Sequence, residues 1–133
     1  MNAEELKQRT RGFALRAVKL AASLPKGRIG DVFARQLVRS GTSVAANYRA
    51  TCLARSRAEF LAKLGLVQEE ADETVFWIEM AADAGLVRKK LVEDLVSEGN
   101  EILAIIVASR KTAKTRQRQA GTAKASKADR MRS

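Results

Sequence analysis

The chain has 133 residues and a net charge of +10, with one cysteine and no histidine, so an internal disulfide is excluded and the commonest general base and metal ligand are absent. Apolar residues make up 46% of it and aromatic residues 5%, which favours a single helical domain. Arg16 and Lys19 interrupt the N-terminal apolar stretch and no apolar run approaches the roughly 18 residues of a membrane span. We therefore expect a cytoplasmic protein with no signal peptide and no membrane segment.

The first predicted helix covers about residues 2–24. Its apolar side chains fall on one stripe, formed by Leu6, Phe13, Ala17, Leu20 and Leu24. The basic side chains lie mainly off that stripe and give the helix a basic outer face. Pro25 and Gly27 end the helix, and the short linker of residues 25–30 predicts that the next helix is an antiparallel neighbour.

The second predicted helix begins near Asp31, which can cap it. Its apolar seam consists of Phe33, Leu37, Val44, Tyr48 and Cys52. Residues 40–43 offer an alternative in which two short helices replace one. The apolar phase before Gly41 continues after it, which favours one helix in which Gly41 permits a close helix contact.

The third predicted helix, residues 56–85, is the longest uninterrupted pattern. Ser56 and Glu59 form a capping box at its start, and Gly85 lies where a left-handed residue would end it. Between them an apolar seam recurs at alternating spacings of four and three, formed by Phe60, Leu64, Val67, Ala71, Thr74, Ile78 and Ala81. A helix of this length, about 43 Å, requires neighbours of similar length.

The fourth predicted helix covers about residues 88–112. One stripe is formed by Leu91, Leu95, Gly99, Ile102 and Ile106, and a second set, Val92, Val96, Leu103 and Val107, makes the apolar arc wider than one packing face requires. The sequence therefore predicts an all-α, up-down-up-down four-helix bundle over residues 1–112 that associates with other copies. Residues 113–133 contain no large aliphatic residue except Met131, and we predict a disordered basic tail.

Charge is segregated along the chain. Residues 1–57 have a balance of +9, residues 58–109 a balance of −7, and residues 110–133 a balance of +8. Such segregation indicates surfaces for charged partners.

Four stretches resemble a known family: residues 40–47 (SGTSVAAN), 57–61 (RAEFL), 69–74 (EEADET) and 76–79 (FWIE). The chain is similar, over about residues 5–112, to the bacterial four-helix-bundle family named for proteins encoded in intervening sequences of large-subunit ribosomal RNA genes. Ser43, Val44, Ala46 and Asn47 match the family pattern Ser-hydrophobic-Pro-small-Asn. Ala45 replaces the usual proline, and residues 49–51 depart from the usual end of the motif.

This resemblance implies a ring-shaped homopentamer, with no enzymatic activity and no cofactor. It also implies a relation to accessory proteins of diversity-generating retroelements, which share the fold and the ring. Those proteins bind a reverse transcriptase and its RNA through basic surface.

Three polar features of the sequence are candidate sites. Glu69, Glu70, Asp72 and Glu73 carry oxygen ligands for a cation, but helical spacing separates Asp72 from Glu69 and Glu73. We expect a solvated or salt-bridged face, which could meet the basic first helix of a neighbouring copy. Cys52 is in phase with the seam, so we expect packing and no reactivity. For Asn47 we predict a hydrogen bond that fixes helix register, with ligand contact as the alternative.

Basic residues carry the functional prediction. The candidate nucleic-acid-binding residues are Lys7, Arg11, Arg16, Arg35, Arg39, Lys111, Lys114, Arg116 and Arg118. No aromatic residue is interleaved with the tail, so the sequence gives no indication of base stacking. We expect a non-enzymatic homo-oligomer that associates with RNA or with an RNA-handling partner such as a reverse transcriptase. The alternative is a purely structural or protein-interaction scaffold whose charges only hold subunits together.

Overall fold

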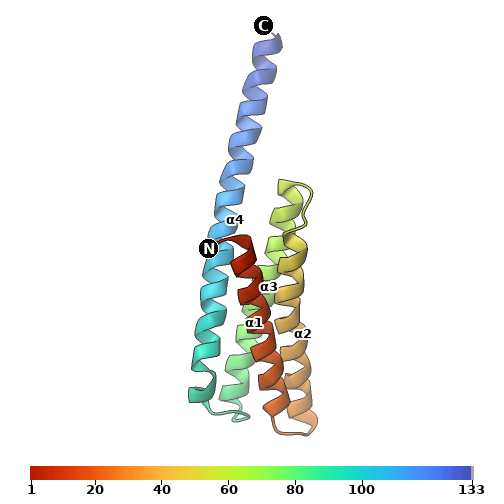
Figure 1. Ribbon diagram of the computed structural model, residues 1–133, viewed down its shortest axis with the longest axis vertical. Helices are drawn as coiled ribbons and strands as arrows, with labels where there is room; N and C mark the ends of the chain where they lie inside the picture. The colour runs from red at the N-terminus through yellow and green to blue at the C-terminus, as the bar shows by residue number, and fades with distance from the viewer. Residues whose placement is uncertain (133) are drawn as a thin grey trace.

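The computed structural model describes residues 1–132, which form four helices and no strand. These are α1 (Ala3–Ser23), α2 (Arg28–Thr51), α3 (Arg57–Asp83) and α4 (Lys89–Arg132). Consecutive helices run in opposite directions and lie side by side (Figure 1), which confirms the predicted four-helix bundle. Within residues 1–132 no helix combines the length and the apolar character that crossing a membrane requires.

Local signals in the sequence set most helix ends. The side chain of Asn2 accepts a hydrogen bond from the Glu5 backbone N–H at 2.8 Å, and Ser56 accepts one from Glu59 at 3.0 Å. The Glu59 carboxylate accepts from the backbone N–H of Arg55, one residue before the partner expected in a capping box. Gly85 follows α3 with a φ of 77°, as predicted.

The start of α2 differs from the prediction. Gly27, with a φ of 141°, occupies the capping position, and Asp31 lies inside the first turn. The helix therefore begins earlier, because a glycine can adopt the left-handed backbone that turns the chain out of the loop after Pro25.

All four helices contribute to one core. The largest side chains that are fully enclosed include Phe13, Leu37, Leu64, Ile78, Ile102 and Ile106. The α3 seam is confirmed from Leu64 to Ala81, while Phe60 at its upper end is half-buried. Thr74, within this seam, donates its hydroxyl hydrogen to the carbonyl of Glu70 at 2.7 Å, so its burial leaves no polar atom unsatisfied.

Gly41 lies at a close contact between α1 and α2. A Cβ atom at this position would approach the Cβ of Ala17 to 2.7 Å, so only glycine fits without displacing a helix. The helix continues through residues 40–43, which confirms the single-helix interpretation and excludes the break.

The C-terminal part of α4 corrects a prediction. The helix does not end near residue 112 but continues to Arg132, although side chains beyond Ala113 are exposed. The tail lacks the apolar periodicity that a packed helix needs, but it contains no proline and is rich in Ala, Lys, Arg and Gln. Extending an existing helix avoids the unfavourable nucleation step, so these residues can remain helical without a packing partner.

The apolar arc of α4 also differs from the prediction. Leu91 is 66% exposed and Val92 takes the core position at this end of the helix. Val96 and Leu103 are half-buried against the core, so much of the arc is used within the bundle. Large apolar side chains are instead exposed on the other three helices, among them Leu15, Val38, Leu66 and Phe76.

Candidate nucleic-acid interface

Charge divides the molecule by helix. We call α1 and α2 the basic layer, because they carry nine Lys and Arg against three acids, a balance of +6. Helix α3 carries two against seven, a balance of −5. We call residues 114–132 of α4 the projecting segment; it carries seven against Asp129, a balance of +6.

The basic layer presents most of the predicted residues to solvent. Arg11, Arg16 and Arg35 are exposed. Lys7 is partly exposed, and its Nζ atom lies 3.4 Å from Oε2 of Glu4. Within this layer a shallow groove between α1 and α2 has mainly apolar walls, with Arg35 and Arg39 on its α2 side. Four of the groove's apolar residues are Val18, Ala22, Ala34 and Val38.

Arg39, one of the predicted nucleic-acid-binding residues, is already paired with carboxylates of the neighbouring helix. Its guanidinium binds Glu70 at 3.2 Å and also binds Glu73, both on α3. The hydrogen bond from Arg39 lowers the pKa of the Glu73 carboxyl, and the same bond raises the pKa of Arg39. Two of the four clustered carboxylates thus form a salt-bridged face, whereas Glu69 and Asp72 are exposed.

Arg9, absent from the predicted set, links α1 to α4. Its Nε and Nη2 atoms donate to the two oxygens of Glu98 at 2.9 and 2.6 Å, and Nη2 also binds Glu101. The side chains of Arg9 and Glu98 are only 24% and 21% exposed, and their hydrogen bonds raise the pKa of Arg9. Arg9 therefore holds two helices together. Sequence spacing alone could not have identified it, because its partners are about 90 residues away.

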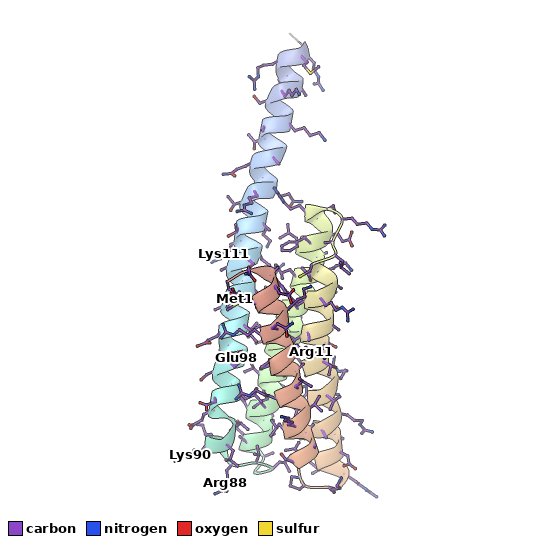
Figure 2. The ribbon with its side chains drawn as sticks, in the orientation of Figure 1. Met1, Arg11, Arg88, Lys90, Glu98 and Lys111 are labelled. Atoms are coloured by element: carbon purple, nitrogen blue, oxygen red, sulfur yellow. The ribbon has the colours of Figure 1, made fainter. Side chains whose placement is uncertain are left out.

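The remaining predicted residues lie along α4. Lys111 is close to the level of Met1 (Figure 2), and above this level α4 extends past the start of α1. Lys114, Arg116 and Arg118 are exposed on the helix that continues from there. Arg110, one turn earlier, is half-buried and donates to Gln68 Oε1 on α3 at 2.6 Å.

Asn47 does not play the predicted role. Its backbone carbonyl accepts a 2.7 Å hydrogen bond from the Thr51 hydroxyl, but its side-chain amide makes no hydrogen bond with any other residue of the described chain, 1–132. Asn47 is half-buried, and the predicted register-fixing hydrogen bond of its side chain is not formed within residues 1–132.

A trough opens at the end of the bundle where α1 begins. The start of α1, the end of α2, the start of α3 and the middle of α4 line this open trough, which has a volume of about 1220 Å³. Tyr48 and Cys52 lie in its wall, and burial, reinforced by the neighbouring Cys52, raises the pKa of Tyr48 to about 12. We call this cavity the end trough. Two of its residues, Arg57 and Phe60, were not among the predicted site residues.

The fold and these surfaces define a small antiparallel four-helix-bundle protein with opposed charged faces. The chain belongs to the family of the 23S rRNA-intervening sequence protein, whose model matches residues 3–108. A crystal structure of a protein of unknown function from the S23 ribosomal protein family of Bacteroides thetaiotaomicron is 32% identical and has a TM-score of 0.77. That likeness covers 84% of this chain and 99% of the other. None of the curated proteins matches the chain.

Proposed function

We propose that this chain is a non-enzymatic, homo-oligomeric bundle protein that binds RNA, or an RNA-handling partner such as a reverse transcriptase, through its basic surfaces. The observation that carries the proposal is the projecting segment, a 19-residue helical extension with a balance of +6. At 1.5 Å per residue it extends about 28 Å. A helix that presents cations to solvent in this way is suited to a polyanion that can lie along it.

The basic layer supplies a second set of cations in this proposal. Arg11, Arg16 and Arg35 are exposed, whereas Arg9 and Arg39 are held by carboxylates and take no part. Phosphate groups are recognised by charge and not by base sequence. Binding is therefore weakly dependent on RNA sequence and falls steeply with salt, because every phosphate contact releases counterions.

Two surfaces of opposite charge, one on α3 and one on the basic layer, support self-association. The outer face of α3 combines the exposed side chains of Leu66, Phe76 and Met80 with the exposed carboxylates of Glu69 and Asp72. The groove of the basic layer offers apolar walls beside Arg35. A contact between the α3 face of one copy and the groove of the next is head-to-tail and closes a ring when the rotation permits. Five copies are what the family resemblance implies.

Sedimentation tests the self-association. The wild-type chain is expected to sediment as an oligomer at micromolar concentration, and Phe76→Ser to shift it towards monomer by removing an exposed ring from the contact. Met131→Ser is the matched control, because Met131 is also exposed but lies on the projecting segment. A wild-type monomer of 14.5 kDa would contradict the proposal.

A second candidate function is a scaffold whose charges serve assembly alone. The pairs Arg9–Glu98 and Arg39–Glu70 favour it, because they show basic residues already used to join helices. Under this alternative the same charges join subunits and bind no nucleic acid.

Titration with two unrelated RNAs at about 50 and 200 mM salt separates the two candidates. The test variant replaces Lys114, Arg116 and Arg118 with glutamine. Its matched control replaces Arg88, Lys89 and Lys90 with glutamine. This change removes the same charge near the start of α4, at the end of the molecule opposite the projecting segment (Figure 2). We expect the test variant to bind about tenfold or more weakly, with a log–log salt slope flatter by about 2, and the control to bind nearly as wild type. Failure of the wild type to bind RNA at low salt would favour the scaffold.

A further inference from the structure

The end trough exists because the helices end at different levels. Helix α1 starts below the α2–α3 connection, while α4 continues past both (Figure 1). The end of α2, the start of α3 and the middle of α4 therefore surround a space that no fourth helix fills. Its volume of about 1220 Å³ exceeds that of most small-molecule pockets, which are about 300–1,000 Å³, so it has room for a nucleotide.

The lining of the end trough has an apolar part and a cationic part. Apolar side chains come from every helix and include Leu6, Tyr48, Phe60, Ile105 and Ala113. Arg57 and Arg116 come from α3 and α4, and neither forms a salt bridge with another residue of the described chain. No Asp or Glu is among the lining residues. An anionic ligand with an apolar, planar portion matches this combination.

Helix ends and polar side chains around the end trough also suit an anionic ligand. The N-termini of α1 and α3, at Asn2 and Arg57, both border the trough and carry positive partial charge, whereas α2 contributes its C-terminus. Asn2, Ser109 and Gln117 also line it and can donate or accept hydrogen bonds. These groups suit the phosphate, ribose and base edges of a nucleotide.

The end trough is continuous with the projecting segment. Arg116, Gln117 and Ala120 belong to both, so a strand lying along the projecting segment reaches the trough directly. The tail sequence contains no aromatic residue, yet the fold brings the half-buried ring of Phe60 into the same cavity as Arg116. Aromatic faces next to cations are the usual means by which proteins hold unpaired bases.

We propose that the end trough binds an unpaired nucleotide of the RNA, with its base against Phe60 and its flanking phosphates on Arg57 and Arg116; this rests on the proposed RNA association. A base inside a duplex is already stacked and cannot enter the cavity. The protein therefore prefers single-stranded RNA to a hairpin stem of equal charge, and tolerates any base because each has a stacking face.

The test compares a dye-labelled single strand of about 12 nucleotides with a hairpin stem of the same phosphate count, by fluorescence anisotropy. Phe60→Leu keeps an apolar side chain but removes the aromatic face. We expect it to weaken single-strand binding about fivefold or more, with hairpin binding and the salt slope unchanged. A strand containing 2-aminopurine is expected to lose fluorescence on binding wild type and less on binding Phe60→Leu.

Substitutions of exposed arginines test the same proposal if Phe60→Leu fails to fold. The double substitution Arg57→Gln and Arg116→Gln changes two exposed residues that line the trough, and Arg118→Gln with Lys124→Gln removes the same charge outside it. We expect the first pair to lose more single-strand affinity than the second, and the two pairs to lose equal hairpin affinity.

Three outcomes would count against the trough. Equal effects of the two pairs of substitutions on both RNAs, or an unchanged 2-aminopurine signal, would overturn the proposal that the end trough binds a nucleotide. Charge-driven RNA binding would remain intact. If the wild type binds neither RNA at low salt, both nucleotide binding in the end trough and the proposed RNA association are overturned.

Discussion

Gly99 of α4 lies against the ring of Phe13 of α1. A Cβ atom at position 99 would approach Phe13 Cε1 to 3.1 Å and the Cγ2 atom of Val75, on α3, to 2.5 Å. Phe13 is fully buried, so neither neighbour can move without disturbing the core. This glycine therefore sets how closely α4 approaches both of its neighbours.

Gly99→Ala is expected to lower the free energy of unfolding by about 1–3 kcal/mol, because the added methyl overpacks the contact. Gly121→Ala is the matched control: it lies in the same helix with open space around it, and alanine should stabilise that helix by up to about 1 kcal/mol. Urea denaturation measures both. An unchanged or raised midpoint for Gly99→Ala would show that the helices separate without cost.

The Arg9–Glu98 pair is expected to stabilise the bundle measurably. A double-mutant cycle with Arg9→Gln and Glu98→Gln should give a coupling free energy of about 1–2 kcal/mol, since both side chains are about three-quarters buried and bonded through two nitrogens. The Glu4–Lys7 pair, with 68% and 38% exposed side chains, should give a much smaller coupling free energy, because water and salt screen it. Equal coupling in the two pairs would contradict this.

The Arg39–Glu73 pair predicts a pH dependence. Because its pKa is lower in the folded state than in the unfolded chain, the Glu73 carboxyl contributes stability above its ordinary pKa. That contribution is lost as the pH falls through the lower, folded-state value. The difference in urea midpoint between wild type and Arg39→Gln should therefore be present at neutral pH and shrink in acid. The corresponding difference in the free energy of unfolding should stay below about 1 kcal/mol, because both side chains are partly exposed.

Ending the chain at Ala120 is expected to leave the thermal midpoint within about 2 °C of the wild-type value, because the deleted residues described by the structure are exposed. Far-UV circular dichroism should lose helical signal in proportion to the deleted helix. A large fall in midpoint would show that this part of α4 packs against the bundle or against another copy.

Local patterns in the sequence are sufficient to predict the four helices and much of the core. Helical periodicity and capping are local properties, so the α3 seam, the Ser56 cap, the left-handed Gly85 and the close contact at Gly41 could all be predicted. Apolar periodicity does not predict the end of α4, because periodicity reports packing, whereas helix propagation depends on the propensities of residues 113–132.

The pairing of charges and the position of the trough depend instead on how the helices pack together. Arg39 reaches Glu70 because α2 and α3 are adjacent in a particular register, and Arg9 reaches Glu98 for the same reason between α1 and α4. Phe60 and Arg116 line one cavity because α1 is the shortest helix of the four and starts below the α2–α3 connection (Figure 1). Contacts between residues far apart in the chain depend on the relative lengths and registers of whole helices, and no local pattern encodes these.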